Sequence, residues 1–268
     1  MSDATVGFSC LHLRRAATDG PLREVAGDLL VSPAWGATPR YFASIATPGH
    51  KLWRRPGMIP AKSLREVVDA ALTSESVSSL SMCSARENGP GFRSVTFARD
   101  ALRGPFSMTD GSRPWAPADP EVDAWVEAVV TFLDRADAGT GVVTVMNDPS
   151  EIMSECTECG VLRNGVLAHP FPEQRERMRE SRKHMGTRYM RFPRWGTLVS
   201  HDHVSQLGGT EAIAKTVEPA IVRPLSGGVY FQLTKSVATA MSGESAAKQR
   251  VFTDLAAPLL PPPIVPPS

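Results

Sequence analysis

RWGTLVSHDHVSQLGGTEAIAKTVEPAIVRPLSGGVYFQLT, residues 194–234, carries the clearest structural signals of the sequence. Ser200 is a good N-cap for a short helix that Gly208 ends. Thr210 is a good N-cap for a second helix, which Pro219 ends because proline cannot continue a helix. The stretch therefore predicts two short consecutive helices.

A β-hairpin is expected directly after these helices. The segments IVRPL and VYFQLT flank the sequence Ser-Gly-Gly at residues 226–228. Glycine adopts positive φ without steric cost, so we expect a tight turn with positive φ at the glycines. Val229, Phe231 and Leu233 then share the face that points to the core.

A final helix is expected over residues 245–257, before Pro258. The residues expected on its inward face are Ala247, Val251, Phe252 and Leu255. The order helix, helix, hairpin, helix indicates an α+β fold, with mixed or antiparallel sheets flanked by helices.

The N-terminal half has its own alternation of strands and helices. The expected elements are a strand inside a sheet at 5–14, a helix at 21–30, a strand at 40–46, a helix at 62–72, and a hairpin formed by 76–85 and 91–99. The two helices are supported by Pro21 at a first helical position and by Ser63 and Glu66 at capping-box spacing.

The chain between these two regions is rich in turn formers. Residues 102–120 contain four prolines together with glycine, serine and aspartate, and we expect a surface connection there. An amphipathic helix follows until Gly139 and Gly141, and then a buried strand, GVVTVM. The predicted units are two intimately joined α/β halves, 1–118 and 119–258, and a proline-rich tail, 259–268. One continuous domain over 1–258 is the alternative.

The overall composition is that of a neutral globular chain. It has 268 residues, 42% of them hydrophobic, and 29 basic against 28 acidic residues give a formal charge of +1. Nothing global points to nucleic acid or to a membrane surface. Charges interrupt the first thirty residues, so we expect neither a signal peptide nor a membrane span, and we expect a cytoplasmic protein. The four cysteines are scattered, which favours reduced thiols.

One resemblance rests on residues of the opening stretch. They are Trp195, Gly196, Thr197 and Leu198, then Val204, Leu207, Gly208 and Gly209, and then Gly227, Gly228, Val229 and Tyr230. This pattern resembles the C-terminal half of the type VI immunity proteins, a bacterial family long catalogued as a domain of unknown function. In that family a tryptophan-led strand, a short helix ending in Leu-Gly-Gly, and a hairpin with paired glycines occur in this order.

The resemblance implies a cytoplasmic antidote that binds and neutralises a cognate antibacterial toxin by occlusion. It covers the chain from Arg194 onward, whereas the N-terminal half is similar only in outline. It implies no catalytic residues, because such proteins do not act by chemistry. It also supplies no contact positions, since these vary from one toxin pair to the next.

The best candidate for a metal site is a CxxC pair followed by two histidines. Its residues are Cys156, Cys159, His169 and His184. Two such thiolates can share a zinc ion, but 14 residues lie between the histidines, where a structural site has three to five. Acidic residues beside the thiols disfavour a redox role. We therefore expect two reduced cysteines on a half-buried helix, with no metal and no cofactor.

No catalytic motif stands out either. His201 and His203 point in different directions on a strand or on a helix, so they do not converge on a metal. The sequence has no G-x-S-x-G turn, no P-loop and no Rossmann glycine run. We expect that the protein is not an enzyme.

A basic segment departs from the neutral average of the chain. Between residues 175 and 194 the basic residues are Arg175, Arg177, Arg179, Arg182, Lys183, Arg188, Arg191 and Arg194. Only Glu176 and Glu180 oppose them. Such a segment steers an acidic partner protein or is simply a solvated helix face followed by a loop.

Nucleic-acid binding is the alternative function for this segment. Arginines neutralise phosphates, and Tyr189, Phe192 and Trp195 are available to stack on bases. We favour the protein partner, because no nucleic-acid motif accompanies the arginines. The candidate contact residues are Arg182, Arg188, Arg191 and Phe192.

Overall fold

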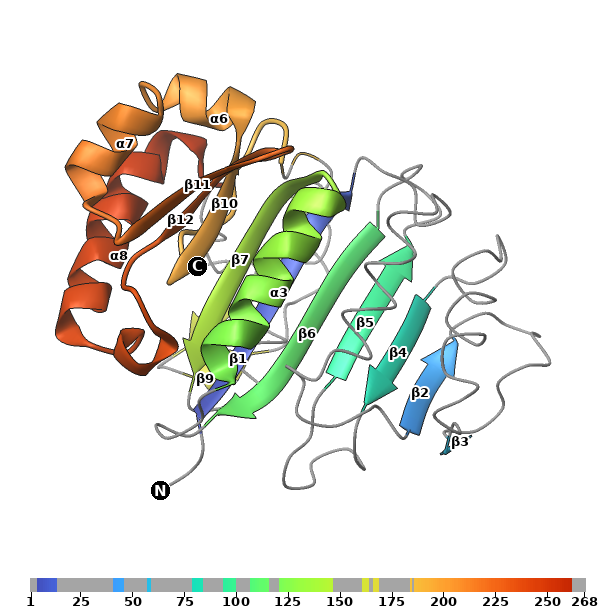
Figure 1. The fold of residues 1–268 in the computed structure, drawn as a ribbon. Coiled ribbons are helices and arrows are strands. Elements are labelled where there is room, and N and C mark those ends of the chain that lie inside the picture. The colour runs from blue at the N-terminus through green and yellow to red at the C-terminus, as the bar shows by residue number, and fades with distance from the viewer. Residues whose placement is uncertain are drawn as a thin grey trace.

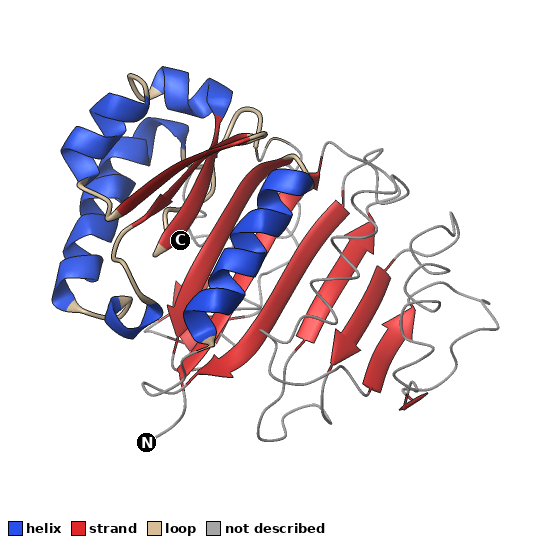
Figure 2. Cartoon of the chain, in the orientation of Figure 1, coloured by secondary structure: helices blue, strands red, loops and turns tan. Residues whose placement is uncertain are grey.

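The computed structural model describes residues 4–13, 41–45, 57–58, 79–83, 94–99, 107–115, 121–146, 161–163, 166–168, 184 and 186–261. Ten of the strands form one sheet in which every paired neighbour is antiparallel (Figure 1). Helices accompany the sheet, so the predicted α+β class is confirmed (Figure 2).

The sheet contains strands from both the N-terminal half and the C-terminal half of the chain. In sheet order its strands are β11 (Ile221–Leu225), β12 (Gly228–Gln232), β10 (Gly196–Ser200), β7 (Ala138–Met146), β1 (Ala4–Leu13), β6 (Ser107–Trp115), β5 (Ser94–Arg99), β4 (Ser79–Cys83), β2 (Tyr41–Ile45) and β3 (Gly57–Met58). A separate pair joins β8 (Val161–Arg163) to β9 (Val166–Ala168). Because β1 lies between β6 and β7, strands from both sides of residue 118 share one sheet.

Three N-terminal predictions are confirmed. β1 is an inner strand of the sheet, β2 lies where a strand was expected, and β4 and β5 form the expected antiparallel pair. The helices predicted at 21–30 and 62–72, and the helix expected around Cys156 and Cys159, lie outside the described residues.

The prediction for residues 102–120 is wrong in its middle part. Instead of a surface connection, β6 pairs with both β1 and β5. The pairing with β5 stops at Ser112, while the pairing with β1 continues, so Pro114 lies where β6 has a described neighbour on one side only. A proline without an amide donor is tolerated at such a position. Hydrogen bonding on both sides outweighs the turn propensity of the rest of the segment.

The expected amphipathic helix is α3 (Val122–Arg135). It ends earlier than predicted, because Asp137 adopts a left-handed conformation with φ 50° and turns the chain directly into β7. Gly139 and Gly141 therefore lie inside the strand and do not end the helix. The buried face of α3 consists of Val122, Trp125, Val126, Val129, Val130, Phe132 and Leu133.

Helix α3 covers one face of the sheet. Phe8 of β1 makes edge-to-face contacts with Trp125 at 5.8 Å and with Phe132 at 6.2 Å between ring centroids. Register places Phe8 opposite Val143 of β7, and Val143 opposite Gly196 of β10. This face therefore continues from the centre of the sheet toward β12. Each edge-to-face pair adds about 0.5–1.5 kcal/mol to the effect of burial.

Two short helices follow β10 as predicted. In α6 (His201–Gln206) the hydroxyl of Ser200 accepts a hydrogen bond from the backbone N–H of His203, which confirms Ser200 as N-cap. The second helix, α7 (Thr210–Val217), differs in one detail, because Gly209 occupies its N-cap position and Thr210 is its first residue. Gly209 has φ +96°, a backbone conformation that residues with a side chain rarely adopt.

The hairpin β11–β12 is confirmed, but its glycines serve another purpose than expected. Neither Gly227 nor Gly228 has a positive φ. A Cβ atom at Gly227 would lie 1.9 Å from the carbonyl oxygen of Ala138, and one at Gly228 would lie 2.0 Å from that of Val199. The two glycines are required because the turn packs directly on the backbone of β7 and β10.

Helix α8 (Gly243–Ala256) lies where the last helix was expected, but it is rotated relative to the prediction. Val251 is 41% exposed and Ala247 is exposed, contrary to the prediction, whereas Phe252 is fully buried as expected and Ala256 is fully buried beside it. The ring of Phe252 meets Phe231 of β12 edge to face at 5.7 Å. The burial of Val229, Phe231 and Leu233 is as predicted.

The sheet is covered on both faces at this end. Adjacent residues of a strand point to opposite faces, so Tyr230 points away from the α8 side that Phe231 occupies. A Cβ at Gly196 would lie 2.2 Å from the Tyr230 hydroxyl oxygen, which shows how closely that ring lies over β10. The C-terminal helices therefore lie on one face of the sheet, and α3 lies on the other face over β7 and β1 (Figure 1).

The close packing of the hairpin turn predicts a large difference between two glycine substitutions. Gly228→Ala places a methyl group against backbone atoms that cannot move aside, and should lower the free energy of unfolding by about 3 kcal/mol. Gly243→Ala is the matched control, because nothing lies within 4 Å of its added Cβ at the start of α8. Urea unfolding should show an unchanged stability, or a gain of up to about 1 kcal/mol, for the control. Equal effects of both substitutions would contradict this packing.

Candidate partner-binding turn

The structure separates the four predicted contact residues. Arg188 is exposed and Phe192 is half-buried, while Arg182 lies outside the described residues. Arg191 is only 1% exposed, so its side chain belongs to the interior and not to the expected surface patch. Of the candidates that are described, Arg188 alone is exposed to solvent.

Arg188 lies in a tight turn formed by residues 184 and 186–189, which we call the basic turn. The carbonyl oxygen of His184 accepts hydrogen bonds from the backbone N–H groups of Thr187 (3.3 Å), Arg188 (2.9 Å) and Tyr189 (2.9 Å). The hydroxyl of Thr187 donates to the same oxygen at 3.1 Å. Gly186 has φ +81°, which favours glycine, and its N–H donates to the carbonyl of Tyr189 at 2.6 Å. Local hydrogen bonds thus fix the backbone of the turn.

An aromatic ring supports the exposed cation. The Cζ atom of Arg188 lies 5.2 Å from the centroid of the Tyr189 ring, a cation–π distance. The imidazole of His184 meets the same ring edge to face at 6.5 Å. Tyr189 is half-buried, so it is held by its surroundings while its face carries the guanidinium group.

The basic turn is attached to the core on its C-terminal side. The N–H of Met190 donates to the carbonyl of Leu259 at 2.9 Å, and the Met190 side chain is buried. The chain then leads to β10, and the Thr197 hydroxyl of this strand holds the backbone of Arg194, two residues before the strand begins. The turn is therefore held on its C-terminal side by the contact of Met190 with Leu259 and by the contact of Arg194 with Thr197.

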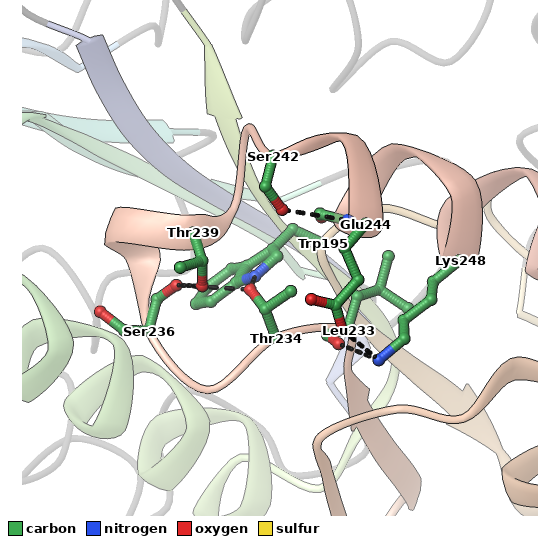
Figure 3. A network of polar contacts seen from close by, with 9 residues as sticks. Trp195, Leu233, Thr234, Ser236, Thr239, Ser242, Glu244 and Lys248 are labelled. Carbon is green, nitrogen blue, oxygen red and sulfur yellow. Dashed lines mark hydrogen bonds and ion pairs between the residues drawn. The ribbon is translucent and has the colours of Figure 1, made fainter.

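The polar network around Trp195 stabilises this anchoring region (Figure 3). The indole Nε1–H of Trp195 donates to the hydroxyl of Thr234 at 2.8 Å, and its carbonyl accepts from the N–H of Leu233 at 2.9 Å. Lys248 of α8 donates to the carboxylate of Glu244 at 2.7 Å and lies 3.5 Å from the Leu233 carbonyl. Trp195 is 3% exposed, so it is a core residue.

A buried histidine lies beside the basic turn. The side chain of His203 in α6 has no exposed surface, and within the described part of the chain neither ring nitrogen has a hydrogen-bond partner of normal geometry. Burial lowers the pKa of His203, while the nearby backbone of Thr187 and Arg188 and the carboxylate of Asp202 act in the opposite direction. We expect a neutral imidazole because the desolvation effect is the largest.

The zinc alternative cannot be assembled from described residues. Cys156, Cys159 and His169 lie outside them, and His184 is exposed with its ring against Tyr189. Within the ranges that the structure describes, no group of three or more metal-binding side chains occurs.

The aromatic platform of the nucleic-acid alternative differs from expectation. Trp195 is buried and its N–H is engaged, so it does not stack on a base. Phe192 is half-buried, and the Tyr189 ring carries the guanidinium of Arg188. Successive exposed rings, which single-stranded nucleic acid requires, are not presented by residues 186–195.

A shallow hollow lies elsewhere on the surface, on α8. Its volume is about 340 Å³, and its described lining is one face of that helix, formed by Ala246, Gln249, Arg250, Thr253 and Asp254. The hydroxyl of Thr253 already donates to the Gln249 carbonyl at 2.8 Å. The basic turn is the better candidate site, because it presents a fixed charge on a fixed backbone.

Comparison with known proteins gives a likeness in fold. The chain matches no protein-family model and no curated protein. Among solved structures it is similar to a T6SS (type VI secretion system) protein of Pseudomonas aeruginosa, PA0821, with a TM-score of 0.57. The match covers 97% of this chain and 73% of the other at 12% sequence identity. At that identity the likeness extends to the fold alone.

Among the helices that the structure describes, none has the length and apolar character that crossing a bilayer requires.

Sequence reasoning missed two features of the site. It treated Tyr189 as a stacking surface for bases, although an adjacent Arg-Tyr pair is also a signal for a cation–π contact. It assigned no role to His203. This residue lies three positions after the Ser200 N-cap, which places it in the first turn of α6. That its ring lies beside residues 187–188 depends on tertiary packing, which no local pattern shows.

The buried His203 predicts a pH dependence of stability. Above its ordinary pKa of 6.5 the ring is neutral in both the folded and the unfolded chain. As the pH falls below that value the unfolded chain takes up a proton more readily, so stability declines, by at most about 1.4 kcal/mol per pH unit. In urea unfolding between about pH 7 and pH 5, His203→Gln should lose this component.

The control for this measurement is His201→Gln, which changes the exposed histidine two positions earlier in the same helix. It should retain the wild-type pH dependence. Identical pH profiles for His203→Gln and wild type would contradict a neutral buried imidazole.

Proposed function

We propose that this chain is an immunity protein, which binds and neutralises a cognate antibacterial toxin of a type VI or related contact-dependent system. It acts in the cytoplasm by occlusion and carries out no catalysis. The observation that carries the proposal is the likeness in fold to a T6SS protein over nearly the whole chain. The sequence resemblance to type VI immunity proteins, from Arg194 onward, supports the same conclusion independently.

The residues that carry the resemblance form the scaffold. Trp195 and Tyr230 are buried, and Gly196, Gly227 and Gly228 lie where a side chain would collide with a neighbour. A pattern of this kind reports on the framework of the molecule and not on its partner. The toxin-binding surface must therefore lie at other positions, and the basic turn supplies one.

Occlusion requires a surface that keeps its shape. The entropic cost of binding is lower when the contact residues are already held in the bound conformation. The hydrogen bonds within the basic turn and the anchoring of Met190 to Leu259 meet this requirement. Truncating one buried anchor of such an interface typically costs about 2 kcal/mol or more.

The proposal predicts protection of a bacterial host. Co-expression of this chain with the toxin encoded beside its gene should restore growth, and the two purified proteins should elute as one complex in size-exclusion chromatography. Gly243→Ala should protect as well as wild type, because its packing is unchanged. A toxin that remains lethal and elutes separately from the wild-type chain would refute the proposal.

A further inference from the structure

We infer that Arg188, held over the ring of Tyr189, is the contact through which this protein binds a carboxylate on an acidic surface of its partner. The inference rests on the proposed function and adds the chemistry of recognition to it. It concerns the basic turn, which presents the guanidinium group to solvent.

The side chain of Arg188 is preorganised for binding. A free arginine side chain loses considerable rotamer entropy when it is fixed in an interface. Here the Arg188 Cζ lies 5.2 Å from the Tyr189 ring centroid, and four hydrogen bonds to the His184 carbonyl hold the backbone beneath it. Much of the ordering is therefore complete before a partner arrives.

The positive charge of Arg188 has no acidic partner among the described residues. Residues 184–194 contain three arginines and no acidic residue. Four of the described carboxylates are engaged with other groups: Glu127 with Arg223, Glu244 with Lys248, Asp123 with Ser236 and Val237, and Asp134 with Ser226. Among described residues none forms an ion pair with Arg188, so its charge is open to an anion from outside.

Within residues 186–194, the number of exposed cations favours a protein over a nucleic acid. Binding to a phosphate backbone depends on several neutralised phosphates. In residues 186–194 Arg191 is buried and Arg194 is half-buried, which leaves Arg188 as the one exposed arginine of that range. A single planar guanidinium suits a carboxylate, with which it forms two parallel hydrogen bonds.

The chemistry of arginine gives a specific expectation for substitution. Lysine keeps the positive charge but lacks the planar fork and the stacking on tyrosine. Arg188→Lys should therefore recover only part of the binding that Arg188→Gln loses. A purely electrostatic patch would instead accept lysine fully.

The test measures binding of full-length variants to the purified toxin encoded beside this gene, by surface plasmon resonance at two salt concentrations. We expect Arg188→Gln to weaken binding by about tenfold or more, and Arg188→Lys to lie between it and wild type. Arg250→Gln, at an exposed arginine of α8, is the matched control and should leave binding unchanged. Raising sodium chloride from about 50 to about 500 mM should slow association of wild type more than that of Arg188→Gln.

The outcomes separate this inference from the proposed function. If wild type binds the toxin and Arg188→Gln binds equally well, the inference fails and the proposed function stands. If the wild-type protein does not bind the toxin, both the inference and the proposed function fail. If a single-stranded oligothymidylate binds wild type more tightly than the toxin does, the recognised anion is phosphate and the inference is overturned.

Discussion

The close approach of the β11–β12 turn to the backbone of β7 and β10 is the constraint on which the rest of the structure depends. The carbonyl oxygens of Ala138 and Val199 occupy the space that side chains at 227 and 228 would need. Two consecutive glycines are the solution, and they bring the last hairpin into register with the central sheet. The turn is fixed further by the N–H of Ser226, which donates to the Asp134 carboxylate at 2.7 Å.

This register decides what each face of the hairpin does. Phe231 packs on α8 while Tyr230 lies over β10 on the other face, so one strand links both layers of the C-terminal region. Arg223 of β11 adds a paired contact with Glu127 of α3 at 2.8 and 3.2 Å. The outcome is a framework in which the basic turn is supported from β10 and from Leu259 near the end of the described chain.

Much of the fold could be predicted because its signals are local. Ser200 caps α6, the apolar period of α3 fits one helical face, and Ser226 with Gly227 forms the two-residue turn. Strand β6 could not be predicted, because its turn-forming residues become a strand only through pairing on both sides. The orientation of α8 also depends on its neighbours, as the exposure of Val251 shows.

The site was less predictable than the fold. A run of arginines indicates a charged surface, but which of them reaches solvent depends on packing. Arg188 lies on a turn and is exposed, whereas Arg191 follows the buried Met190 and is itself buried. Both positions are arginines, so the local sequence does not distinguish the exposed side chain from the buried one. The cation–π pair follows from adjacency in sequence, while the His203 ring beside the turn follows from the placement of α6.

The most direct test of the account is an experimental structure of this protein in complex with the toxin encoded beside its gene. The account predicts that the basic turn is buried against the toxin, with its backbone within about 1 Å of its present position and the Arg188 guanidinium paired with a toxin carboxylate. A complex in which the turn remains in solvent and the toxin lies on another surface would contradict it.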